Sequence, residues 1–236
     1  MLGRRGRTGD VAGPQFLVPP RSDGSIVNDL ASPVPEVAER AKSALVARGT
    51  ESVPLLLFCL ETDGDGLRLR ALSLLALLGD ARAAGPVVSL LRHPEPAIRS
   101  RAAGALARIA APGAVPALTR LLAREDDRTV RTAAVRSLVR LVQTGHDEAL
   151  RPLFQVIADG KDDAGVRIAA LEAVPWATSP GDGAPVRALL QRLANNDSPE
   201  VAQKARRMLN APLRPRLEPW AVQKLIRDLS SDRLSV

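Results

Sequence analysis

One apolar pattern recurs six times along this chain in the same register. A leading branched or apolar residue is followed four residues later by alanine, and eight residues later by leucine or valine. Because such positions share one face of an α-helix, each copy predicts an amphipathic helix with a small residue near its middle. The leading residues are Val37, Leu67, Ile98, Val130, Val166 and Val201, and the alanines are Ala41, Ala71, Ala102, Ala134, Ala170 and Ala205.

A second kind of apolar segment lies between these helices, and each such segment carries a proline near its start. Proline is tolerated in the first turn of a helix, where the amide that it lacks would have no intrahelical acceptor. The segments therefore predict a first helix for each unit, with residues 25–32 as a shortened one at the beginning. The prolines are Pro54, Pro86, Pro116, Pro152 and Pro185.

Helix pairs of this size bury their apolar faces only when they stack on one another. The mid-helix alanines allow neighbouring helices to approach closely, and the larger residues beside them fill the layer between. Only 2% of the residues are aromatic and none is tyrosine, which suits tightly packed helices. We therefore expect an all-α fold, a right-handed α-solenoid of about six helix pairs.

Three segments are expected. Residues 1–22, rich in Gly, Pro and Arg, predict a disordered or loosely docked basic tail. Residues 23–210 form the solenoid. Residues 211–236 read as a proline-spaced linker and an amphipathic helix, which either caps the last repeat or is offered to the groove of a partner.

The net charge of +7 favours acidic partners. The single cysteine, Cys59, lies in an apolar run and excludes an internal disulfide, so a reducing compartment is the simpler expectation. No apolar run approaches the roughly 20 residues that a membrane span requires. The sequence predicts a soluble, cytoplasmic protein without a membrane span.

The early proline of the first helix, the acidic turn, and the Val-Arg opening and alanine of the second helix resemble HEAT repeats, specifically the short bacterial PBS-lyase-like kind. The resemblance covers about residues 25–210. It implies a scaffold or partner-binding module, which is the role of most such arrays, while smaller branches of the family act in phycobilin attachment, on DNA bases or as di-iron hydroxylases.

The resemblance also implies a structural ladder, in which an arginine after each leading residue meets an aspartate of a neighbouring turn. The arginines in that position are Arg68, Arg99, Arg131 and Arg167, and the expected acceptors are Asp65, Asp127 and Asp163. The end units carry Ala38 and Ala202 instead.

A basic stripe is predicted on the flank of the second helices, which in the family line the concave wall. We expect it to bind the acidic surface or peptide of a protein partner; the alternative is that long arginines cover apolar surface and stay solvated. The stripe comprises Arg40, Arg70, Arg101, Arg108, Arg136, Arg140, Trp176, Lys204 and Arg207.

Two alternative functions are also compatible with the sequence. Non-specific binding to a phosphate backbone needs only the stripe, but the scarcity of aromatics argues against base recognition, with Phe58 and Phe154 expected in the core. A lyase-like or chaperone-like role in prosthetic-group attachment is the second alternative. His93 and His146 are expected as turn residues, and neither a metal site nor a nucleotide or nucleophile motif is evident. The sequence thus predicts a non-enzymatic scaffold without a cofactor.

Overall fold

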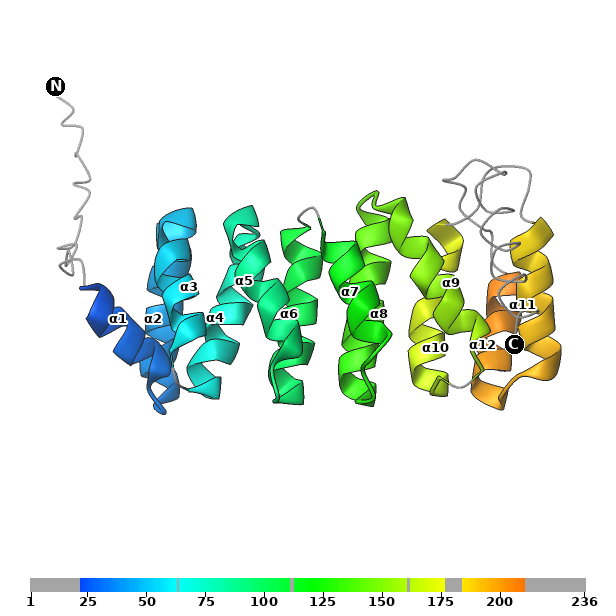
Figure 1. The fold of residues 1–236 in the computed structure, drawn as a ribbon, viewed down its shortest axis with the longest axis horizontal. Helices are drawn as coiled ribbons and strands as arrows, with labels where there is room; N and C mark the ends of the chain where they lie inside the picture. The colour runs from blue at the N-terminus through cyan, green and yellow to red at the C-terminus, as the bar shows by residue number, and fades with distance from the viewer. Residues whose placement is uncertain (1–21, 63, 111–112, 161, 177–183, 211–236) are drawn as a thin grey trace, which may run out of the picture.

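The computed structural model describes residues 22–62, 64–110, 113–160, 162–176 and 184–210. Within these residues the regular structure is entirely helical, and twelve α-helices follow one another as six pairs. Figure 1 shows the pairs side by side in a row, in chain order from the N-terminal to the C-terminal end. The chain is an α-solenoid, as the recurring register predicts.

The first helix of each pair is called helix A. The predicted prolines all lie within the first turn of these helices, where a missing amide removes no helical hydrogen bond. Several helices A are preceded by a short 3-10 turn, which lets the chain bend before the helix begins. The helices A are α1 (Asp23–Ala31), α3 (Val53–Glu61), α5 (Ala84–Ser89), α7 (Ala114–Leu122), α9 (Leu150–Ala158) and α11 (Ala184–Asn196).

The second helix of each pair, helix B, carries the recurring pattern. Three of them, α2, α6 and α12, begin on a proline, and α8 and α10 are capped by the aspartate that precedes them. The helices B are α2 (Pro35–Arg48), α4 (Asp65–Leu78), α6 (Pro96–Ile109), α8 (Arg128–Gln143), α10 (Ala164–Leu171) and α12 (Pro199–Leu209).

The mid-helix alanines lie where the sequence pattern places them. All six are at most 1% exposed, because each helix B packs against its own helix A and against the helices B of its neighbours. The successive contacts of α4 with α6, and of α6 with α8, make the helices B a continuous layer. One apolar core therefore runs through the array instead of ending at each pair.

The two phenylalanines that were expected in the core differ. Phe154 on α9 is fully buried, but Phe58 on α3 is 58% exposed, so that prediction was wrong for Phe58. The nine-residue helix α3 buries Val53, Leu56 and Cys59, and this leaves Phe58 on the opposite side. Burial raises the pKa of the Cys59 thiol, so the thiol is kept in its unreactive neutral form.

The predicted N-terminal tail lies outside the described residues except for Ser22, as do the linker and the amphipathic helix at 211–236. One stretch, Pro35–Glu61, is long and apolar enough to cross a membrane when length and composition alone are considered. It consists of α2, a 3-10 turn and α3, and Gly49 ends α2 with a φ of 62°. Core helices of soluble proteins pass the same test, so the absence of a span stays a prediction.

Candidate protein-interaction face

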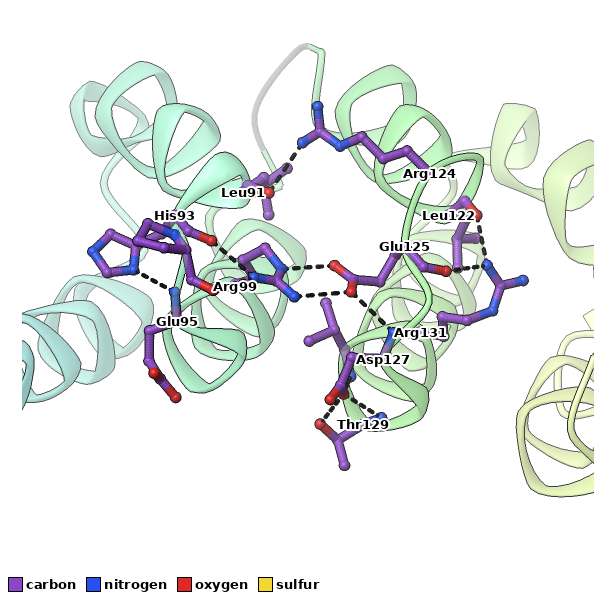
Figure 2. Close-up of polar contacts among 12 residues, drawn as sticks. Leu91, His93, Glu95, Arg99, Leu122, Arg124, Glu125, Asp127, Thr129 and Arg131 are labelled. Carbon is purple, nitrogen blue, oxygen red and sulfur yellow. Dashed lines mark hydrogen bonds and ion pairs between the residues drawn. The ribbon is translucent and has the colours of Figure 1, made fainter.

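Four buried or half-buried arginines, one near the start of each helix B from α4 to α10, tie neighbouring pairs together. Each guanidinium donates to backbone carbonyls at or just after the end of the preceding helix A, and so satisfies acceptors that the helix leaves open. In three cases it also reaches a carboxylate in the next link between a helix A and a helix B. We call this set the arginine ladder; it comprises Arg68, Arg99, Arg131 and Arg167 (Figure 2 draws its middle part).

The rung at Arg99 shows the geometry. Its Nε donates to Oε2 of Glu125 at 2.7 Å and its Nη2 donates to Oε1 at 2.9 Å, while Nη1 donates to the carbonyls of His93 and Pro94 (Figure 2). Burial opposes the charge of Glu125, but the hydrogen bonds from Arg99 and from the Asp127 amide outweigh it and leave the pKa of Glu125 lowered. The same pairing raises the pKa of Arg99. Both groups stay charged at neutral pH.

Two of the expected ladder acceptors are wrong. Arg131 pairs with Asp162 through two hydrogen bonds of 2.7 Å, and Arg167 pairs with Asp197 through two of 2.6 Å. The predicted Asp127 and Asp163 are N-caps instead. A residue directly before a helix aims its carboxylate at the amides of its own helix, so only the acids one or two positions earlier reach the preceding pair.

The predicted contact of Arg68 with Asp65 is present, at 2.6 Å, but it lies within the first turn of α4. Glu125, the acceptor of Arg99, lies two residues before the N-cap of α8. The equivalent residue before α6, which faces Arg68, is His93. Its Nε2 lies 3.3 Å from Nη1 of Arg68, and its Nδ1 accepts the amide of Glu95, as Glu125 accepts the amide of Asp127. This rung alone of the four lacks a carboxylate from the next link.

Part of the predicted basic stripe is used for packing. Arg70 donates to the carbonyls of Leu30 and Ser32 at the end of α1. Arg108 donates through Nε to the carbonyl of Ala76, at 3.1 Å. Three members of the stripe therefore contact a neighbouring helix pair: these two and Lys204, which lies 4.0 Å from Glu172.

The other basic members lie on the exposed side of the helices B. Arg40 contacts only a carbonyl of its own helix, at 3.3 Å. Among the described residues no hydrogen-bond or ion-pair partner is found for the side chains of the exposed Arg101, Arg136, Arg140 and Arg207. Trp176 ends a 3-10 turn (η5, Val174–Trp176), and its side chain lies outside what the structure describes.

A groove of about 690 Å³ hollows this face where α4 and α6 lie side by side. Three cationic side chains line it, and no acidic residue is among the lining residues. The predicted stripe contains Arg101 and Arg108 but neither Lys42, which lies outside the stripe's spacing, nor Leu77, which occupies the position that holds arginine in the next two units. The lining residues are Lys42, Ser73, Ala76, Leu77, Ala97, Ser100, Arg101, Gly104, Ala105, Arg108 and Thr129.

The family model that describes HEAT repeats matches residues 53–139, from the start of α3 into α8. This stretch of the chain consists of HEAT repeats. No curated protein matches the chain.

Two engineered proteins with crystal structures from the Northeast Structural Genomics Consortium are similar to this chain. One is 21% identical, with 88% of this chain and 97% of that chain covered and a TM-score of 0.51. The other is 22% identical, with 80% and 98% covered and a TM-score of 0.52. At this identity the likeness shows the fold alone.

The complex of CpcE and CpcF of phycocyanin lyase from Nostoc sp. PCC7120 also matches, with 18% identity, 92% of this chain and 98% of that chain covered, and a TM-score of 0.39. Among the residues of this chain that the structure describes, no group of three or more His, Cys, Asp or Glu side chains is placed to hold a metal ion.

Proposed function

We propose that this protein is a non-enzymatic scaffold that binds an acidic surface or peptide of a partner protein on the exposed face of its helices B. The observation that carries the proposal is the groove between α4 and α6, which is lined by three cations and by no carboxylate. The ladder arginines are matched by acids or carbonyls of the chain itself. Of the groove cations, the Arg101 side chain has no partner among the described residues, Arg108 donates only to a carbonyl, and Lys42 pairs with the exposed Glu39. An acidic partner would supply the missing charge.

The exposed arginines of α8 extend this positive face. Arg136 and Arg140 lie one turn apart on the same side of α8, and no partner for either is found among the described residues. Isolated surface charges contribute little to affinity, but aligned charges of one sign steer an oppositely charged partner and speed its association. Binding is therefore expected to weaken as salt rises.

The test is a pull-down from native lysate with quantitative mass spectrometry, using the full chain and two charge-reversed variants. The first changes Arg101, Arg136 and Arg140 to glutamate. The matched control changes three exposed arginines of helices A to glutamate: Arg120, Arg151 and Arg187. We expect the same proteins on the unchanged chain and on the control, and their loss from the first variant. Equal capture by all three chains would refute the proposal.

A second assay on the same purified chain distinguishes a nucleic-acid partner from a protein partner. Binding to a mixed-sequence oligonucleotide that falls by orders of magnitude between about 50 and 200 mM salt would indicate phosphate-backbone contacts. If the oligonucleotide binds the unchanged chain and competes with the captured proteins, the partner class proposed here is wrong. We expect no such competition at moderate salt.

A further inference from the structure

Gly104 on the groove floor has no evident role in folding. It lies in the interior of α6, outside the left-handed region of backbone conformation, and a Cβ built on it meets no atom within 4 Å. Glycine inside a helix destabilises it by about 0.5–1 kcal/mol relative to alanine. The chain thus bears a folding cost at this position, and the consequence is an open floor in the groove.

Leu77 adds an apolar contact point to the same groove. It lies in the last turn of α4 and is 51% exposed, although Leu74 and Leu75, two and three residues earlier in the helix, are buried. A single exposed leucine is ordinary on a protein surface. This one lines a concave site together with Ala76, Ala97 and Ala105, so an apolar side chain seated there would lose water on several sides.

The cations of the groove are available to a ligand. No partner for Arg101 is found among the described residues. Arg108 donates through Nε to the Ala76 carbonyl, and its two terminal nitrogens meet no acceptor in the part of the chain that the structure describes. Lys42 contacts Glu39 at 3.1 Å, but both side chains are about half exposed or more, and such pairs are weak.

We infer that the groove between α4 and α6 anchors the partner by binding an extended acidic peptide, whose main chain crosses Gly104 and whose apolar side chain contacts Leu77. This rests on the proposed function and narrows it to one site and one class of ligand. Arg101 and Arg108 are two helical turns apart, about 10 Å along α6, which is roughly three residues of extended chain. Two carboxylates at that spacing, with an apolar residue between them, match the groove.

The composition of the groove favours a peptide over a single-stranded nucleic acid. Sites for single strands combine cations with aromatic side chains on which bases stack. The residues lining this groove include no aromatic, and alanine, glycine and leucine make up about half of them. A narrow floor of small residues instead accommodates a peptide main chain and one aliphatic side chain.

The test uses a short fluorescent peptide with the core Glu-Leu-Gly-Glu and measures its binding to the full chain by fluorescence anisotropy. Gly104→Gln fills the floor without changing the charge, and the chain keeps its fold because nothing lies near the new Cβ. We expect this variant and Arg101→Glu each to weaken binding by about tenfold or more. Gly85→Gln on α5, where a Cβ also meets nothing within 4 Å, is the matched control and leaves binding unchanged.

Peptides that differ in one feature complete the design. Replacing the leucine of the probe by glycine weakens binding, and replacing both glutamates by lysine abolishes it. No binding of the acidic probe at millimolar concentration, or equal binding by Gly104→Gln, would overturn the inference. If Gly104→Gln also retains the proteins that the triple glutamate variant loses, the scaffold proposal stands and the groove is not its anchor. Tighter binding of a single-stranded oligonucleotide than of the peptide overturns both.

Discussion

Arg99 on α6 and Glu125 in the link before α8 are joined by two parallel hydrogen bonds of 2.7 and 2.9 Å (Figure 2). The same guanidinium binds two carbonyls of the link before its own helix, so one side chain connects two successive helix pairs. Charge-assisted bidentate pairs are stronger and more directional than single hydrogen bonds. The ladder therefore fixes how each pair is set on the next, in addition to the apolar core that they share.

Glu125→Gln is expected to lower the free energy of unfolding by roughly 2 kcal/mol, because it leaves the half-buried Arg99 without its charged acceptor. Chemical denaturation followed by circular dichroism measures this. Asp126→Asn removes the same charge from the exposed neighbouring residue and is expected to change stability by less than about 0.5 kcal/mol. Equal losses from the two variants would show that the ladder does not stabilise the array.

Stability is expected to fall in acid. Hydrogen bonds from Arg99 and the Asp127 amide lower the pKa of Glu125 against the effect of burial, and the hydrogen bond from Arg167 lowers the pKa of Asp197. A carboxylate whose pKa is lower in the folded than in the unfolded state stabilises the fold at any pH above its unfolded-state pKa, which is about 4. This stabilisation is lost as the pH falls through the folded-state pKa. The midpoint of denaturant-induced unfolding should not change with pH near neutrality, and it should decrease once the pH is below about 4. In Glu125→Gln the decrease of the midpoint with falling pH should be shallower. An unchanged decrease would show that Glu125 does not contribute to it.

His93→Glu is expected to complete the ladder and raise the free energy of unfolding by about 0.5–1 kcal/mol. The new carboxylate would accept the amide of Glu95, as Glu125 accepts that of Asp127, and would pair with Arg68. The gain stays small because Asp65 is already 2.6 Å from Arg68 and repels a second acid. His146→Glu, made at the other histidine, has no ladder arginine to meet and should bring no gain. A destabilised His93→Glu protein would show that the imidazole is the better partner.

The two phenylalanines should respond very differently to truncation. Phe154→Ala removes a fully buried ring and is expected to lower the free energy of unfolding by about 3–5 kcal/mol. Phe58→Ala removes a ring that is 58% exposed and should cost well under half of that. Thermal and urea unfolding of the two variants measure the difference. A comparable loss from both would mean that Phe58 is covered in solution.

The ladder shows where reasoning from sequence reached its limit. The four arginines are fixed by one repeat position, so they could be named without coordinates. Their acceptors could not, because Glu125 and Asp162 share their links with other acids, Asp127 and Asp163, only one or two residues away. Which acid faces the preceding pair depends on the path of the link, and the N-cap role of the last acid in the link removes it from the choice.

The residues of the basic stripe fall into two groups, those that pack against a neighbouring helix and those that stay exposed, for a similar reason. Sequence spacing places Arg70, Arg101 and Arg108 on one flank of their helices, but it does not show where the neighbouring helix ends. Arg70 lies next to the carbonyls at the end of α1 and is used for packing, whereas Arg101 lies over the groove and meets no recorded partner among the described residues. The same residue type in the same register thus has two different surroundings.

The sequence alone determined the helices, their pairing and the burial of the repeated alanines, since a repeated register of alanine and leucine buries its apolar faces only when the pairs stack. The contacts between pairs were decided only in three dimensions: the acid that each ladder arginine binds, the exposure of Phe58, and the groove that joins Lys42, Leu77 and Arg101 from three helices. The spacing of residues in the sequence determines on which face of its own helix a side chain lies. What the side chain meets there depends on the displacement and rotation of the next helix, which no local pattern encodes.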